Sequence, residues 1–290
     1  MRRIISASRR TDIPAYHTDW FVRRLKEGFV YVRHPFKHTV ERVSLRAGDV
    51  HSLVFWSKNY SPLISRLHEV EAVTRNLFFH FTITALTEPF EPSSPPKDEA
   101  IRDLLYLSRR YSVEQVIWRF DPIVLTAELT PEYYLEKFTL FCERLGGGVK
   151  DCYISFVNLY GKVSSRLERM GIKVLEPTFK EKLLLTERLA TVGSRYGIRV
   201  SVCCEPHLSK VTGRAVCIDG ERLGRLFGER PSVRRMPTRK GCNCTESVDI
   251  GAYNSCPARC LYCYANSTER VVEKMLATHN PYFNALGFNL

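Results

Sequence analysis

The sequence predicts an α/β fold, a TIM-type barrel that is complete or slightly open, in one domain over residues 1–290. Three observations predict it. The length of 290 residues suits one barrel of this type. Short apolar segments alternate with helical patterns, which is typical of parallel strands joined by helices. About eight such strands can be recognised, and no internal repeat or low-complexity tract interrupts them.

The strand segments are rich in β-branched and aromatic residues and are bounded by polar turns. They are Arg3–Ala7, Phe29–Arg33, Leu53–Trp56, Leu77–Ile83, Gln115–Trp118, Cys152–Val157, Arg199–Cys203 and Val248–Ala252. Helices are expected at Thr18–Lys26, Tyr60–Val70, Lys97–Tyr111, Pro131–Arg144, Phe179–Tyr196 and Thr268–Ala277. The segment Phe29–Leu45 could instead be a hairpin, because it returns as Thr39–Leu45. In a closed barrel the last strand would lie beside the first.

The composition excludes several classes of protein. With 44% hydrophobic and 26% charged residues, collagen, coiled coil and wholesale disorder are excluded. No apolar run is long enough to cross a bilayer, and Met1–Ser6 lacks the apolar region of a secretory signal, so we expect a cytoplasmic protein with no membrane partner. The net charge of +12 suggests an anionic partner, with nucleic acid first. Ten cysteines without an export signal favour metal or redox chemistry over disulfides.

Three of the cysteines form a closely spaced motif near the carboxyl terminus. It reads Cys256-Pro-Ala-Arg-Cys260-Leu-Tyr-Cys263, with Tyr262 directly before the third cysteine. Three thiolates on so short a loop can bind three corners of a [4Fe–4S] cluster and leave the fourth iron open to a substrate or cofactor. A structural zinc site would favour two well-separated pairs, and a ferredoxin run would use a different spacing. The motif therefore predicts a [4Fe–4S] site.

This spacing resembles that of the radical S-adenosylmethionine (SAM) superfamily, and the extension around Tyr262 looks like the spore photoproduct lyase branch. The resemblance implies that the open iron holds the amine and carboxylate of SAM. It also implies a permuted order, because the cluster loop usually follows the first strand and here follows the last. The segment that holds the SAM amine should then follow Arg3–Ala7, where Ser6 and Ser8 are the candidates. No acidic residue stands there before Asp12.

A second set of cysteines lies upstream. Cys204, Cys217, Cys242 and Cys244 could close a fully ligated site, either an auxiliary iron–sulfur cluster or zinc. Two alternatives stay open: reduced thiols in a loop, or a fourth ligand for the first cluster, which would abolish SAM chemistry. Residues 204–263 thus form a cysteine-rich, metal-binding segment within the domain. Because side chains alternate along a strand, Cys203 should face away from Cys204 and into the core. Cys142 and Cys152 are also expected to be core residues.

Polar residues follow most of the predicted strands. In a barrel of this type, active-site groups lie at the carboxyl ends of the strands. We therefore expect a polar pocket, and the candidate catalytic residues are Arg9, Arg10, Asp12, Lys58, Arg119, Asp121 and Glu205.

Several motifs together resemble one bacterial family, domain-of-unknown-function family 1848, whose carboxyl-terminal cysteines have been likened to the radical SAM cluster. The motifs span nearly the whole chain and are Ile5–Pro14, Val54–Asn59, Val116–Pro122, Asp249–Tyr253 and the Cys-x3-Cys-x2-Cys run. The resemblance implies family membership and an iron–sulfur site, and it implies no particular reaction.

Three functions fit these observations. The first is a radical SAM-type enzyme acting on a nucleic acid or nucleotide, although an anionic small molecule or a peptide fits nearly as well, with ferredoxin or flavodoxin as electron donor. The second is an iron–sulfur protein without SAM, serving electron transfer, Lewis-acid chemistry or sulfur transfer. The third is a nucleic-acid-binding module with structural metal, favoured by a cationic set beside the cysteines. Its members are Arg222, Arg225, Arg230, Arg234, Arg235, Arg239 and Lys240.

Overall fold

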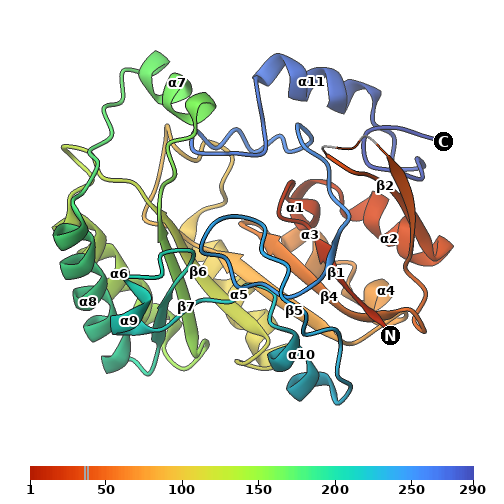
Figure 1. The fold of residues 1–290 in the computed structure, drawn as a ribbon, viewed down its shortest axis with the longest axis horizontal. Helices are drawn as coiled ribbons and strands as arrows, with labels where there is room; N and C mark the ends of the chain where they lie inside the picture. Colours follow the sequence, from red (N-terminus) through yellow and green to blue (C-terminus); the bar gives the residue numbers. More distant parts are fainter. Residues whose placement is uncertain (36, 38) are drawn as a thin grey trace.

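A seven-stranded parallel sheet forms the centre of the computed structural model, which describes residues 1–35, 37 and 39–290 (Figure 1). Its strands are β1 (Arg3–Ala7), β4 (Val50–Ser57), β5 (Leu77–Thr82), β6 (Val116–Ile123), β7 (Asp151–Phe156), β8 (Arg199–Val202) and β9 (Val248–Asp249). They lie in the order β8-β7-β6-β5-β4-β1-β9, and every neighbouring pair is parallel. The predicted α/β class is confirmed, and the last strand does lie beside the first.

The remaining two strands form a separate antiparallel hairpin, β2 (Phe29–Arg33) and β3 (Val40–Ser44). This confirms the hairpin alternative and removes Phe29–Arg33 from the parallel sheet. The predicted end of β6 is wrong, because the strand continues past Trp118 through a shift of register between Phe120 and Ile123. Arg119 therefore lies within the strand and not in the loop after it.

Helices connect the strands. The longer ones are α2 (Thr18–Glu27), α5 (Lys97–Arg110), α6 (Pro131–Leu145), α7 (Gly161–Arg169), α8 (Phe179–Arg195), α10 (Gly220–Phe227) and α11 (Glu269–Thr278), and the short ones are α1 (Ile13–Tyr16), α3 (Ser61–Ile64), α4 (Leu67–Glu71) and α9 (Ser209–Thr212). Threonine caps begin several of them, as at Thr178, where a capping box with Glu181 satisfies two backbone N–H groups. The predicted helix Tyr60–Val70 is divided into α3 and α4. No helix in the described ranges has both the length and the apolarity needed to cross a membrane.

The two faces of the sheet are covered differently. Side chains alternate along each strand, so that Leu53 and Phe55 face the large helix-covered core while Val54 faces the other side. On that other side a smaller core includes Val54, Tyr153 and Leu223 of α10. The chain between β8 and β9 covers this second face, as the teal-to-blue segment in Figure 1 shows. The cysteine-rich segment is thus packed directly on the sheet.

Candidate functional site

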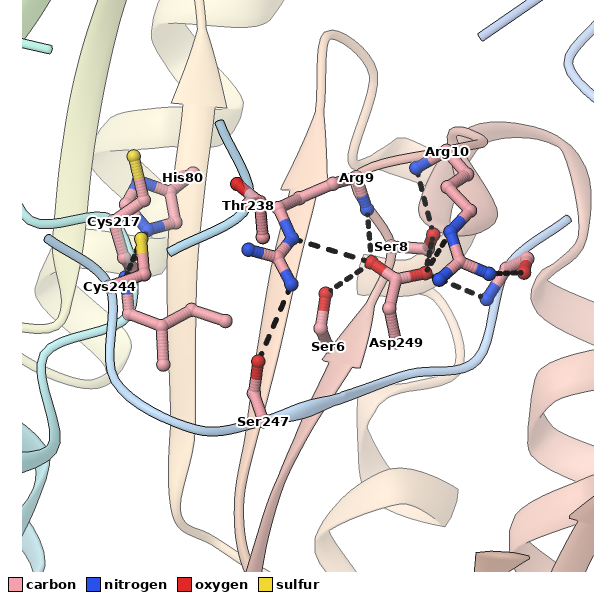
Figure 2. A network of polar contacts seen from close by, with 12 residues as sticks. Ser6, Ser8, Arg9, Arg10, His80, Cys217, Thr238, Cys244, Ser247 and Asp249 are labelled. Carbon is pink, nitrogen blue, oxygen red and sulfur yellow. Dashed lines mark hydrogen bonds and ion pairs between the residues drawn. The ribbon is translucent and has the colours of Figure 1, made fainter. Parts of the chain in front are cut away.

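A buried carboxylate, Asp249, ties the end of β9 to the end of β1 (Figure 2). Its oxygens accept hydrogen bonds from Ser6 Oγ at 2.7 Å, Ser8 Oγ at 2.6 Å, the Arg9 backbone N at 2.9 Å and the Gly251 N at 3.0 Å. Burial alone would raise the pKa of Asp249, but the charges of Arg10 and Arg9 hold it below its ordinary value. Ser6 and Ser8, the predicted cofactor contacts, are therefore engaged with Asp249.

Gly251 makes this close approach possible. A Cβ at this position would lie 2.0 Å from Ser8 Oγ, inside the packed contact between the two segments. The glycine in the Asp249–Tyr253 motif is thus required by the packing of the last loop on β1.

Arg9 and Arg10 flank Asp249 on its two sides. Arg9 Nε lies 3.5 Å and Arg10 Nε 3.8 Å from the carboxylate. Arg9 also lies over the Trp56 ring, 5.8 Å from its centroid, and its Nη2 donates to Ser247 Oγ at 3.4 Å. In the part of the chain that the structure describes, Arg9 Nη1 is buried and has no hydrogen-bond partner. A guanidinium held in this way is suited to bind an anionic group.

A second buried ion pair joins Lys58, after β4, to Glu91 in the loop before α5. Lys58 Nζ lies 2.7 Å from Glu91 Oε1, which also accepts from Thr84 Oγ1 at 2.8 Å and from Tyr262 Oη at 2.5 Å. Burial would raise the pKa of Glu91, but Lys58 and Lys97 lower it to about 2. This carboxylate is therefore charged at neutral pH, and it anchors Tyr262 of the cysteine motif.

Asp12 holds the start of α1 in place. One carboxylate oxygen accepts from the Ala15 N at 3.0 Å, as a helix N-cap does, and the other accepts from the Lys58 N at 3.1 Å. Burial raises the pKa of Asp12 to about 6. The structure gives this predicted catalytic residue a positioning contact with the turn that presents Lys58.

The loop of Cys256, Cys260 and Cys263, called here the thiol loop, is held by its backbone. Arg166 of α7 donates to the carbonyl of Cys260 at 3.0 Å and also to that of Cys263. Asn266 Nδ2 donates to the Cys256 carbonyl at 2.7 Å. These bonds fix the path of the loop without involving the thiol groups.

The thiol loop carries three cysteines between positions 256 and 263, a set that would hold three irons of a [4Fe–4S] cluster. Across the described ranges, no three His, Cys, Asp or Glu side chains have the arrangement of a single-ion site. A [4Fe–4S] cluster needs no such convergence, because each thiolate binds a different iron. Cys263 Sγ also accepts the backbone N–H of Ala265 at 3.3 Å. Such N–H···S bonds are among the contacts that tune iron–sulfur clusters.

Five further cysteines form a second group, called here the thiol ring. Its members are Cys203, Cys204, Cys217, Cys242 and Cys244. Cys203 Sγ lies 3.5 Å from Cys204 Sγ and 3.8 Å from Cys217 Sγ. The backbone N–H of Cys244 donates to Cys242 Sγ at 3.4 Å, and that of Ile218, next to Cys217, donates to Cys244 Sγ at 3.4 Å. The four predicted ligands of a second site are thus brought together.

Cys203 is buried in the smaller core, as predicted, but it does not point away from Cys204, because the two sulfurs lie 3.5 Å apart. β8 ends at Val202, and Cys204 has a left-handed φ of 60°, so the alternation of a strand does not apply to this pair. Gly241 packs against the same turn, where a Cβ would lie 2.7 Å from the Cys204 carbonyl oxygen. Cys142 and Cys152 are buried in the large core, as predicted.

Arg119 of β6 links the ring to the polar edge of the sheet. Its guanidinium donates to Cys217 Sγ at 3.0 Å and forms an ion pair with Asp121, which also accepts from Ser155. Glu205 lies apart from these groups and pairs with Lys182 at 3.4 Å on a half-exposed surface. Arg9, Lys58, Arg119 and Asp121 therefore lie between the two thiol groups, while Glu205 lies at the rim.

Four residues with central contacts were missing from the sequence prediction: Asp249, Glu91, Arg166 and Arg239. Asp249 ends a strand of two residues, and the rule that site residues follow strands would have found it. Glu91 lies in a Pro- and Ser-rich stretch that reads as a linker. Arg166 lies in a segment with no strand end or motif, so no pattern indicated it. Arg239 belongs to the cationic set beside the cysteines, whose pattern indicates a nucleic-acid surface and not a partner of the cysteines.

The described residues line two hollows, one away from the predicted site residues and one beside Lys58. One of about 360 Å³ lies beside α2 and is lined by charged residues such as Arg23 and Arg66, away from every predicted site residue. The other, of about 10 Å³, lies between Lys58, Glu91 and Lys97. The second is large enough for about one water molecule.

Fold and site together define an α/β protein whose carboxyl strand ends carry two groups of thiols and a row of buried arginine and lysine side chains. Residues 4–265 match the family model described as Domain of unknown function (DUF1848). The chain belongs to this family, which confirms the resemblance carried by its motifs. The comparison with curated proteins gives no match.

Proposed function

We propose that this chain is an iron–sulfur enzyme of radical SAM type that acts on an anionic substrate. The observation that carries the proposal is the thiol loop, which lies at the carboxyl edge of the sheet and is fixed by Arg166 and Tyr262 rather than by its thiols. Cys256, Cys260 and Cys263 would hold a [4Fe–4S] cluster. When reduced, such a cluster supplies one electron for the cleavage of SAM into methionine and a 5′-deoxyadenosyl radical.

The residues of this chain would bind and position the other groups. Arg9 has a buried, unpartnered Nη1, and Arg10 lies on the other side of Asp249, so the pair offers two guanidinium groups to a carboxylate or phosphate. Lys58 stays protonated because Glu91 raises its pKa against the effect of burial. Glu91 in turn fixes Tyr262, and the helix-covered core behind the sheet excludes water.

The barrel interpretation of the fold is part of this proposal. From β1 through β4 to β8, each new strand is added on the same side of the previous one, with no reversal of direction. A doubly wound sheet reverses at a switch point, whereas barrels wind in one direction. The sheet order therefore favours a TIM-type barrel, complete or slightly open, with the cysteine loop after its last strand.

The test is anaerobic reconstitution with iron and sulfide, followed by iron counting and a SAM cleavage assay with dithionite. We expect 5′-deoxyadenosine from the wild type, and a loss of at least about 100-fold in Cys260→Ala. Cys142→Ala, a buried thiol outside both groups, should keep the activity. Unchanged cleavage in Cys260→Ala would contradict the assignment.

A second candidate is an iron–sulfur protein without SAM chemistry. It is favoured by the contacts of Asp249, whose oxygens already accept four hydrogen bonds and leave no carboxylate free for the SAM amine. Reconstituted iron without SAM cleavage or SAM binding would support this candidate instead. A ferredoxin or flavodoxin would serve as redox partner in either case.

The contacts of the basic side chains near the cysteines argue against a nucleic-acid-binding module. Arg222 is occupied by Asp151 at 2.7 Å, Arg234 by Glu246 at 2.7 Å, and Arg239 donates to Cys204. These three charges are used within the chain, which leaves only part of the basic set to meet a nucleic acid. A nucleic acid or nucleotide therefore enters the proposal as a substrate class for the Arg9 and Arg10 site, in a cytoplasmic enzyme.

A further inference from the structure

The thiol ring is not used by the proposed reaction, and its sulfurs are not arranged as disulfides. All five cysteines are free, and the Sγ–Sγ separations of 3.5 and 3.8 Å are far longer than a bond of about 2.05 Å. Cys203, Cys217 and Cys244 are buried, while Cys204 and Cys242 are partly exposed. Five thiols gathered beside the sheet, with Cys203 in contact with both Cys204 and Cys217, need a different explanation.

The donors around the ring point to negatively charged sulfur. Arg119 Nη1 and Arg239 Nε each lie 3.0 Å from a ring sulfur, and neither guanidinium can act as an acceptor. The backbone N–H of Ile218 also points at Cys244 Sγ at 3.4 Å, and that of Cys244 at Cys242 Sγ at 3.4 Å. Thiolates bound to a metal carry the negative charge that these donors would stabilise.

The spacing of the sulfurs distinguishes between kinds of metal group. Two thiolates on one tetrahedral ion with bonds of about 2.3 Å lie about 3.8 Å apart, which is the separation of Cys203 and Cys217. Adjacent members can therefore share one ion. No three of the ring's thiols have single-ion geometry in the described residues, however, which is unlike the four convergent ligands of structural zinc.

We propose that the thiol ring binds a [2Fe–2S] cluster through four of its five cysteines, two thiolates on each iron. The site lies on the face of the sheet opposite the large helical core, next to the arginines of the proposed substrate site. Arg239, together with Arg119, which also pairs with Asp121, offsets part of the net charge of about −2 of an oxidised cluster with four thiolates. The inference is independent of the reaction at the thiol loop.

The test uses the full chain with Cys256, Cys260 and Cys263 all replaced by alanine, reconstituted anaerobically with iron and sulfide. We expect about two irons and two acid-labile sulfides per chain to remain. Adding Cys242→Ala and Cys244→Ala should remove both, whereas adding Cys142→Ala should leave them in place. Because the thiol loop is disabled throughout, a failure of the SAM proposal does not affect this result.

Retention of zinc alone, of four irons, or of no metal would each overturn the assignment. A second variant guards against misfolding of the cysteine replacements. Arg239→Met keeps every thiol and removes one nearby cation. We expect it to bind the same iron and to shift the reduction potential of the ring cluster to a more negative value, because the reduced cluster carries more negative charge. An unchanged potential would contradict the placement of the cluster against Arg239.

Discussion

The thiol loop and the thiol ring hold their sulfurs by different means. In the loop, Arg166 and Asn266 bind backbone carbonyls. In the ring, Arg119 and Arg239 donate directly to sulfur. The loop is thus held mainly through its backbone carbonyls, with one N–H bond to Cys263 Sγ, whereas two guanidinium groups bind sulfurs of the ring directly. The two neighbouring cysteine groups are therefore held by different kinds of contact, which favours separate roles for them.

The largest expected loss of stability is that of Asp249→Ala, because Asp249 connects the end of β9 to the end of β1. Asp249→Ala leaves Arg9 and Arg10 without their counter-ion and four donors without an acceptor. We expect a loss of about 3–5 kcal/mol in the free energy of unfolding, measured by urea denaturation under anaerobic conditions. Asp98→Asn, which breaks an exposed pair with Arg144, should change stability by less than about 1 kcal/mol. Equal losses of unfolding free energy in the two variants would show that Asp249 contributes no more to stability than an exposed ion pair does.

Glu91→Gln should have the next largest effect, and it acts on the loop side. The substitution keeps hydrogen-bonding atoms but leaves the buried Lys58 unpaired, so we expect a loss of about 2–4 kcal/mol at pH 7. The matched control is Glu114→Gln, whose exposed pair with Lys150 is worth about 0–1 kcal/mol.

The same variant gives a pH dependence with a defined sign. The pKa of Glu91 in the folded chain is lowered to about 2, below the value of about 4.3 expected for an unfolded chain. Its contribution is therefore complete above about pH 5 and is lost as the pH falls toward 2. The stability difference between wild type and Glu91→Gln should narrow over that range. A difference that widens on acidification would contradict the assigned ionisation.

Arg166→Met should affect the loop backbone and leave the ring unchanged. The loss of charge-assisted bonds to the Cys260 and Cys263 carbonyls should raise amide hydrogen exchange in residues 255–266 by about 10–100-fold, corresponding to about 1.5–3 kcal/mol. Exchange around Cys217 and Cys244 should stay as in the wild type. If both regions loosened together, the two thiol groups would not be independently held.

The smallest expected change in stability is that of Glu205→Gln, next to the thiol ring. Glu205→Gln breaks a half-exposed pair with Lys182, one residue after Cys204. We expect a change of about 0–1 kcal/mol in unfolding free energy and unchanged iron content. A loss of iron would place Glu205 in the ring site, contrary to its position at the rim.

Most strands and helices of the α/β fold could be predicted from the sequence. Short runs of β-branched and apolar residues, such as Ile4 and Ile5, indicated the strands, and the helix predicted from Phe179 does begin there. Cysteine spacing identified both thiol groups. It could not reveal Glu91 or Arg166, because their contacts depend on loops that meet only in the folded chain. Cysteine spacing also could not show that Cys203 and Cys204 lie on the same side, because both follow the end of β8 and Cys204 has a left-handed backbone.

The most direct test of the account is a reciprocal measurement of iron and sulfide in two variants. One lacks the thiols of Cys256, Cys260 and Cys263, and the other lacks those of Cys242 and Cys244. The account predicts about two irons in the first, about four in the second and about six in the wild type. If either variant lost all of its iron, or if both matched the wild type, the claim of two separate iron–sulfur sites would be contradicted.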